Sequence, residues 1–238
     1  LEFKIQVVRD NLSRIGGVEL PEKIEAFAAD KQYQYRNKAS FAVQGKTSDP
    51  QIGFYSEGSH KVADSPTCDI LPEPINNAKE WLREILKKNQ ISVYNEGNHR
   101  GLVRGLVIRH SESTGEVLVG MMTNEGRFPR NFLTELTEEK KLKELGIVGI
   151  IQNINPRATN VILGKENRLL WGKERLTDKL ADLSFHLSLG SFFQIHSAQT
   201  LRLYDLIENW VDAAEGETII DAYSGSGGIA LWLAAKGK

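Results

Sequence analysis

Cysteine is almost absent from this sequence of 238 residues, in which Cys68 is the single example. One cysteine excludes an internal disulfide framework and favours a reducing, cytoplasmic environment. It also cannot hold a metal cluster unless further ligands come from outside the chain. No apolar run approaches the roughly 18–20 residues needed to span a bilayer, so we expect no membrane partner.

An excess of positive charge is also missing, since the formal net charge is −1. This balance argues at first against a nucleic-acid partner. The basic residues are clustered, however, and the stretch 97–111 contains no acidic residue while it carries His99, Arg100, Arg104, Arg109 and His110. Such a local cluster is compatible with a phosphate-binding face.

Hydrophobic periodicity predicts an antiparallel α+β layer over most of the chain. A first amphipathic helix should cover residues 3–15 and end at Gly16-Gly17. The spacing predicts two further helices, at 75–86 and 134–145, and a β-hairpin formed by 102–110 and 116–123. Other short strands are expected at 33–43, 51–55, 60–64, 148–153, 160–163, 168–171 and 183–187.

The pattern changes near Ser191. Ser197 can cap a helix, a short strand is expected at 218–222, and an apolar helix should begin at Ile229 after a glycine-rich loop. A strand, a glycine loop and a helix in this order open a doubly wound parallel sheet. We therefore predict one domain at 1–190 and, because an open sheet is incomplete after one strand, the truncated start of a second at 191–238.

The glycine loop places Asp221 four residues before Gly225, with Gly227 and Gly228 next. Glycines let the main chain turn sharply and approach a ligand, and the amides of the following helix can bind an anionic group. Gly225 and Gly227 with Ala230 also fit a dinucleotide fingerprint. A carboxylate beside the loop would repel a pyrophosphate, yet it suits the cationic methionine part of S-adenosylmethionine. A tight turn without any ligand is the remaining alternative.

Two motifs carry a resemblance to a known family. Ser191-Phe-Phe-Gln-Ile-His196, followed by Asp221-Ala-Tyr-Ser-Gly-Ser-Gly227, resembles the S-F-F-Q-x-N and D-x-Y-C-G-x-G pair of RNA 5-methyluridine (uracil-C5) methyltransferases. Further similar segments lie at 35–38, 53–55, 59–60, 64–68, 114–118 and 152–156. Their spread along the chain favours the branch that modifies 23S ribosomal RNA, with transfer RNA as the alternative substrate.

The resemblance implies an α+β antiparallel central domain that contacts RNA, followed by the beginning of an α/β Rossmann-like class I methyltransferase domain. It also implies that Gln194 and Tyr223 contact S-adenosylmethionine beside the main chain of 225–228. Two departures are Ser224, where the family usually has cysteine, and His196, where it usually has asparagine.

Cys68 matches the last of four cysteines that hold a 4Fe-4S cluster in many members of this family. Its three partners would lie upstream of Leu1, so we expect no cluster in this chain. The nucleophilic cysteine and the general base of the family would lie beyond Lys238. We therefore expect no catalytic residue here, and we expect the chain as given to be inactive.

Four basic residues are candidates for phosphate contacts, namely Arg36, Lys38, Arg100 and Arg104. For each of them a solvated surface charge is an equally good interpretation. Two other functional classes were weighed. One is an RNA-binding module without catalysis, and the other is a nucleotide-dependent oxidoreductase, which Asp221 disfavours.

Overall fold

The computed structural model describes residues 1–157, 162–214 and 216–237. These residues form two compact units, Leu1–Gln32 and Tyr33–Lys238. In the first unit, α1 (Glu2–Asp10) continues into the π-helical turn η1 (Asn11–Ile15) and buries no residue, so the expected N-terminal helix is confirmed. Among the described residues, no helix combines the length and the apolar character that crossing a membrane requires.

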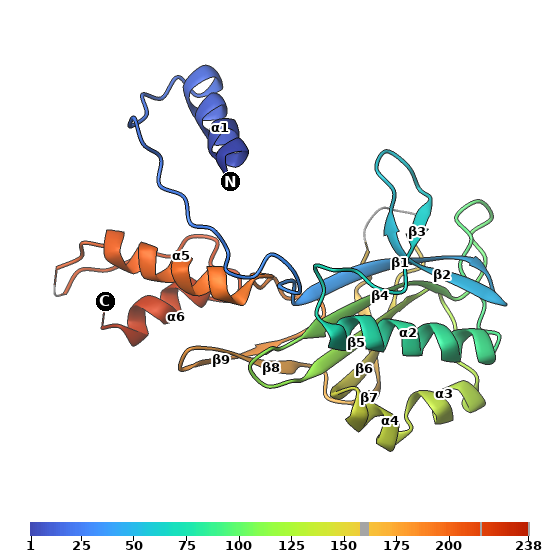
Figure 1. The fold of residues 1–238 in the computed structure, drawn as a ribbon. Helices are drawn as coiled ribbons and strands as arrows, with labels where there is room; N and C mark the ends of the chain where they lie inside the picture. Colours follow the sequence, from blue (N-terminus) through green and yellow to red (C-terminus); the bar gives the residue numbers. More distant parts are fainter. Residues whose placement is uncertain (158–161, 215, 238) are drawn as a thin grey trace. The chain divides into compact units, whose positions relative to one another are not determined.

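The second unit is built on a seven-stranded sheet with the order β3-β2-β1-β4-β5-β6-β7 (Figure 1). Its strands are β1 (Lys38–Lys46), β2 (Asp49–Tyr55), β3 (Val62–Asp64), β4 (Val103–His110), β5 (Val117–Thr123), β6 (Ile147–Ile154) and β7 (Glu166–Gly172). The two strands of the expected hairpin, β4 and β5, are antiparallel neighbours. Half of the expected strand at 160–163 falls outside the described residues, and residues 162–163 are not in a strand.

The sheet is mixed, which corrects the expectation of a wholly antiparallel layer. β5 and β6 are parallel, because the chain between them passes through α3 (Arg130–Leu136) and α4 (Glu139–Glu144) before it returns. A helical crossover of this kind brings the next strand back in the same direction. The single helix expected at 134–145 is divided at Glu138, whose side chain accepts hydrogen bonds from the amides of Lys140 and Lys141 and caps α4.

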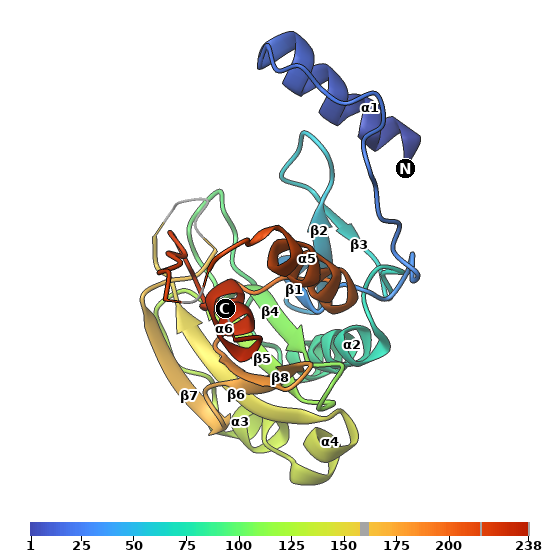
Figure 2. The ribbon, with the colours of Figure 1, turned by 90° about the vertical axis from the view of Figure 1, so that its left-hand side faces the viewer.

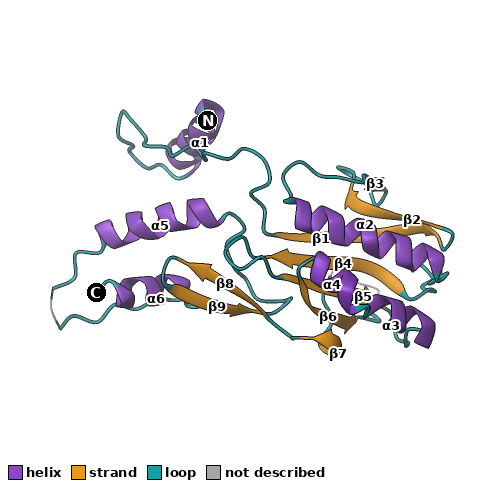
Figure 3. Ribbon diagram, turned by 60° about the horizontal axis from the view of Figure 1, so that its bottom comes forward, coloured by secondary structure: helices purple, strands orange, loops and turns teal. Residues whose placement is uncertain are grey.

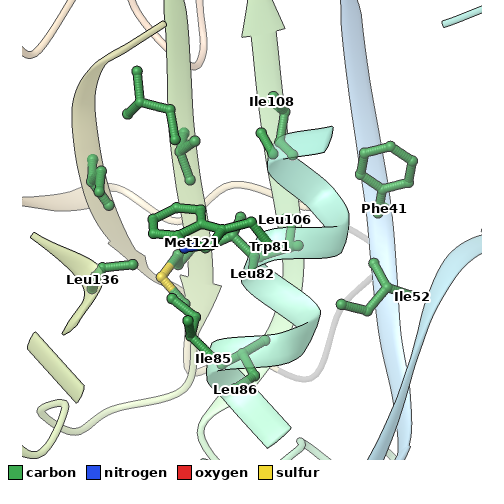
Figure 4. Packing of buried hydrophobic residues seen from close by; sticks show 14 of the residues in the cluster. Phe41, Ile52, Trp81, Leu82, Ile85, Leu86, Leu106, Ile108, Met121 and Leu136 are labelled. Atoms are coloured by element: carbon green, nitrogen blue, oxygen red, sulfur yellow. The ribbon is translucent and has the colours of Figure 1, made fainter. Parts of the chain in front are cut away.

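One face of the sheet is covered by helices. α2 (Glu73–Lys88) buries Ile75, Ala78, Leu82, Ile85 and Leu86 at helical spacing. These side chains belong to one cluster with Phe41, Ile52 and the apolar residues of β4 and β5, and Figure 4 shows Leu82, Ile85 and Leu86 among them. Residues of α3 and α4 belong to the same core, and Figure 3 shows the three helices together on this side of the sheet.

The other face is partly covered by a second apolar cluster. It joins sheet residues to the hairpin β8 (Leu176–Leu180) and β9 (Leu183–Leu187) and to α5 (Ser197–Trp210) and α6 (Gly228–Ala235), which lie beside each other in Figure 2. β8 was not predicted, because its middle residue is Asp178. That carboxylate is buried and accepts hydrogen bonds from the hydroxyls of Ser111 and Ser113, so a charged residue lies where an apolar one is expected.

The C-terminal region follows the prediction in part. α5 begins at Ser197, but the capping residue is His196 rather than Ser197. α6 begins at Gly228, close to the expected start. Residues 218–222 do not form the expected strand, because no described strand pairs with them and a strand needs such a partner for its main-chain hydrogen bonds. The domain boundary at residue 190 stays a prediction.

The α2 face of the sheet should determine much of the stability. Leu82 is fully buried there, whereas Leu169 on β7 is 42 % exposed. We expect Leu82→Ala to lower the free energy of unfolding by about 2–5 kcal/mol, since it leaves a cavity in the packed core. The same truncation at Leu169 should cost less than about 1 kcal/mol. Urea unfolding followed by circular dichroism measures both, and equal losses would contradict this account of the core.

Candidate functional site

The segment 191–196 is attached to the start of β1. The amide of Asn37 donates to the carbonyl of Ile195 at 3.0 Å, and the side-chain Nδ2 of Asn37 donates to the carbonyl of Gln194 at 3.0 Å. The ring of His196 stacks on Tyr35 with a centroid distance of 4.8 Å. Residues separated by more than 150 positions in sequence are therefore held side by side.

Arg109 extends this attachment from the neighbouring strand. Arg109 on β4 lies directly opposite Lys38 on β1 in the antiparallel strand pairing. Its guanidinium donates to the carbonyl of Ser191. Arg109 is only 2 % exposed, and this burial lowers its pKa to about 10 although Asp178 acts in the opposite direction. Its Nε has no hydrogen-bond partner among the described residues. Arg109 thus positions the segment 191–196 and is not itself accessible to a ligand.

Three cations gather at this end of the sheet. Burial, followed by the charges of Arg109 and Arg36, lowers the pKa of Lys38 to about 8. Arg36 lies beside it and donates from Nε to the carbonyl of Lys38 at 3.0 Å. The predicted RNA contacts Arg36 and Lys38 therefore lie together, next to the predicted cofactor residue Gln194. An anion placed here would relieve their mutual repulsion.

The loop that contains Cys68 is hydrogen-bonded to the residues just before β1. The amides of Gln34 and Arg36 donate to the carbonyls of Asp69 and Ile70, and Asn76 on α2 bonds to the main chain of Cys68 in both directions. Cys68 is half-buried against the α2 core. In the described part of the chain, no group of three or more His, Cys, Asp or Glu side chains could hold a metal. One thiol does not fit a four-iron cluster, which takes four cysteines.

The glycine loop is an exposed turn closed by Asp221. Gly225 and Gly227 adopt φ values of 58° and 74°, a left-handed conformation that favours glycine. The Asp221 carboxylate accepts from the amide of Ala230 at 3.2 Å and so caps the start of α6. Tyr223 also has a positive φ, and its side chain is fully exposed. Asp221 was predicted to face a cationic ligand, and one oxygen of its carboxylate accepts the hydrogen bond of this cap.

Gly228 has a packing role that the sequence did not reveal. A Cβ at this position would overlap the hydroxyl of Tyr204 on α5, so a side chain here would push the two helices apart. Tyr204 also packs on Trp232 with ring centroids 5.8 Å apart, and Trp232 donates to Glu208 at 3.2 Å. Burial, followed by the charge of Asp221, raises the pKa of Tyr204. The glycine loop is thereby held against α5.

The cofactor site was predicted to consist of the segment 191–196 and the glycine loop, and these two parts have different surroundings. Phe193 shares an apolar cluster with Tyr204 and Trp232, which links the segment 191–196 to the helices around the loop. Within the described residues, no hydrogen bond joins Gln194 to Tyr223 or to the loop. That Gln194 and Tyr223 line one pocket stays a prediction.

The other two predicted RNA contacts lie on a different part of the sheet. Arg104 is placed over the ring of Tyr94 at 4.4 Å and donates to the carbonyls of Asn155 and Arg157. Arg100 is exposed in the turn that precedes β4. The structure thus groups Arg36 with Lys38 and assigns Arg104 to the wall of a separate cavity.

Sequence reasoning missed three contributors to this region. Asn37 and Arg109 were not singled out as positioning residues, because their partners are distant in sequence. The third is Phe192, which is 70 % exposed beside Gln194, whereas the adjacent Phe193 packs against Phe185. The signal in the sequence was the pair of adjacent aromatic residues. In an extended segment, neighbouring side chains point to opposite sides, so one of the two should be exposed.

Comparison with known proteins finds relatives of similar sequence. No protein-family model matches the chain. A protein of Clostridium tetani named as an uncharacterized RNA methyltransferase is 35 % identical over all of this chain and 51 % of its own length. A protein of Lactobacillus johnsonii with the same name is 39 % identical over 98 % of this chain and 51 % of its own length. Over the region that it spans, the chain is similar to proteins that are named RNA methyltransferases.

A solved structure shows the same fold. The tRNA (uracil-54, C5)-methyltransferase of Pyrococcus abyssi, in complex with S-adenosyl-L-homocysteine, matches 99 % of this chain and 54 % of its own chain with a TM-score of 0.78 and 30 % identity. The chain spans about half the length of the relatives it matches. These matches confirm the family resemblance and the fold class expected from the sequence. The expected antiparallel layer is corrected to a mixed sheet.

The crowding of cations at the start of β1 gives a titration that can be measured. In a pH titration of the Lys38 side-chain carbon resonances, we expect a midpoint near the pKa of about 8. Arg36→Gln should raise that midpoint, because it removes one repelling charge while an amide at the same place can still donate a hydrogen bond. Arg127→Gln, in an exposed loop, should leave it unchanged. A midpoint typical of a solvated lysine, near 10.4, would contradict the described burial.

Proposed function

We propose that this chain is part of an enzyme that transfers a methyl group from S-adenosylmethionine to C5 of uracil in RNA. The observation that carries the proposal is the match of the whole fold to a uracil-C5 methyltransferase, together with the paired motifs at 191–196 and 221–227. The RNA methyltransferase relatives support the reaction class. The neighbour's complex with S-adenosyl-L-homocysteine, the demethylated product of the donor, supports the cofactor.

In this proposal the C-terminal part of the chain holds the methyl donor. Gln194, Tyr223 and Asp221, with the main chain of Gly225, Gly227 and Gly228, form one side of the site. Asp221 fixes the start of α6, and the left-handed glycines present main-chain atoms without a Cβ in front of them. The exposed ring of Tyr223 is free to cover a ligand in the loop. The bound donor supplies an electrophilic methyl group on its sulfonium.

The RNA is proposed to contact the end of the sheet beside Gln194. Arg36 and Lys38 offer positive charge to phosphates, and Phe192 offers an exposed aromatic face to a base. Arg100 and Arg104 would extend the contact along the sheet. A target base must leave its stack to reach a methyl donor, and unpaired loops of RNA make this step cheaper.

The remaining chemistry is assigned to residues outside this chain. Uracil C5 is a weak nucleophile, and a thiolate that adds at C6 makes it reactive before a base removes the C5 proton. Cys68 is the only thiol here, but it is tied into the loop beside α2 and packed against the core. We therefore assign it no catalytic role.

For the RNA class, we propose 23S ribosomal RNA first, because motif matches extend along the whole chain. Transfer RNA is the second candidate, and the named substrate of the Pyrococcus neighbour favours it. Incubation of the full-length protein with labelled S-adenosylmethionine and each unmodified RNA distinguishes the two. Label that appears as 5-methyluridine in one RNA identifies the substrate, and label in neither contradicts the proposal.

Gln194 provides the test of the donor site. We expect Gln194→Ala in the full-length protein to weaken S-adenosylmethionine binding about tenfold, the effect of one lost polar contact in a binding site. Gln51→Ala, an exposed glutamine on β2, should have no effect on binding. Titration calorimetry measures both variants. Equal affinities of the Gln194→Ala and Gln51→Ala proteins would remove Gln194 from the site.

A further inference from the structure

A cavity of about 770 Å³ lies away from the segment 191–196 and the glycine loop. We call it the aromatic cavity and define it by Tyr55, His60, Tyr94, Glu96 and Arg104, and residues 40–45 of β1 also line it. Neither Gln194 nor any residue of the glycine loop lines it. Its volume lies in the range of pockets that hold small organic ligands.

One wall of the aromatic cavity is a hydrogen-bonded group of three side chains. The Tyr55 hydroxyl donates to Oε1 of Glu96 at 3.0 Å, and Nδ1 of His60 lies 3.4 Å from Oε2 of the same carboxylate. The Tyr55 and His60 rings are neighbours with centroids 5.7 Å apart. Tyr55 is 47 % exposed, so its ring presents a face to the cavity while its hydroxyl is fixed by Glu96.

The opposite wall carries a fixed positive charge. The Arg104 guanidinium lies 4.4 Å from the centre of the Tyr94 ring and is held by the carbonyls of Asn155 and Arg157. Tyr94 is in turn fixed by a hydrogen bond of 2.7 Å between its hydroxyl and Nδ1 of His99. A guanidinium whose position is fixed in this way can stack on a planar ligand or bind a phosphate at the rim.

These groups select the class of ligand. Glu96 would repel a phosphate inside the cavity, but a carboxylate accepts hydrogen bonds from the exocyclic amino group of a base such as cytosine. The faces of Tyr55 and Arg104 suit the flat ring of an unpaired base. Uracil has no exocyclic amino group, and its N3–H donor lies between two carbonyl oxygens that the Glu96 carboxylate would repel. The cavity therefore fits cytosine, adenine or guanine better than it fits the base that is to be methylated.

We propose that the aromatic cavity binds an unpaired, amino-bearing base of the RNA substrate at a position other than the methylated uracil. This inference rests on the proposed function, since RNA is the ligand. β1 connects the two places, because Lys38 begins the strand beside Gln194 and residues 40–45 of the same strand line the cavity. At about 3.3 Å per residue the cavity extends from roughly 7 Å to roughly 23 Å along the strand from Lys38, distances that a short single strand of RNA can bridge.

The test uses the full-length protein and two probes, fluorescent oligocytidine and oligouridine of equal length, at low salt. We expect wild-type protein to bind oligocytidine more tightly than oligouridine in anisotropy titrations. Tyr55→Ala should weaken oligocytidine binding roughly tenfold, the effect of losing one stacked base. Tyr55→Phe should keep most of the affinity, because it retains the ring. Glu96→Gln should reduce the preference for oligocytidine, since it removes the charged acceptor.

Matched controls separate the cavity from general effects. Trp210→Ala truncates an exposed aromatic residue on α5, and Glu174→Gln neutralises an exposed carboxylate between β7 and β8, both outside the cavity. Both controls should bind oligocytidine like the wild type. Thermal unfolding verifies that Tyr55→Phe and Glu96→Gln are folded.

Two results would overturn the inference. One is equal affinity of the wild type for the two probes, and the other is Tyr55→Ala binding oligocytidine as well as Trp210→Ala does. Methyl transfer by the same preparations separates this inference from the proposed function. A wild type that methylates RNA while Tyr55→Ala retains its binding refutes the cavity alone. A wild type that binds oligocytidine through Tyr55 but forms no 5-methyluridine refutes only the proposed reaction.

Discussion

The attachment of Asn37 to the segment 191–196 is the interaction on which the rest of the candidate site depends. Its amide and its side chain both donate to carbonyls of that segment, while the residues just before it bond to the loop of Cys68. A main-chain amide and an asparagine side chain together satisfy two carbonyls that would otherwise be left without protein partners. Arg109 and the stacked ring of His196 strengthen the same junction. The start of β1 thereby becomes the point where three distant parts of the chain meet.

This junction would give the proposed RNA-contacting surface and the proposed methyl-donor site a common boundary. The cations of Arg36 and Lys38 and the backbone of Gln194 are held on the same few residues, so the two proposed binding surfaces share a fixed boundary. Phe193 continues the connection, because it packs in the cluster that contains Tyr204, and Tyr204 in turn supports Gly228. The aromatic cavity, which residues 40–45 of β1 line, would give the RNA a second anchoring point.

Local patterns in the sequence predicted the elements well where each element buries its own apolar face. The helix now seen as α2 and the strand β9 at Leu183–Leu187 are examples. The predictions of secondary structure failed where contacts with another part of the chain determine the structure. The segment 218–222 has strand character but pairs with no described strand, β8 contains the buried Asp178, and the parallel pairing of β6 depends on the crossover before it. The site residues were found through motif resemblance, whereas the Asn37 contact joins positions that no local pattern relates.

Amide hydrogen exchange at Asn37 tests the central claim most directly, because the carbonyl of Ile195 is the acceptor for that amide. We predict that the Asn37 amide is protected in the wild type and that His196→Ala, which removes the stacking on Tyr35, accelerates its exchange. The amide of Val119, in the centre of the sheet, should exchange at the same rate in both proteins. An Asn37 amide that exchanges as fast as an unstructured one, or that does not respond to His196→Ala, would contradict the account.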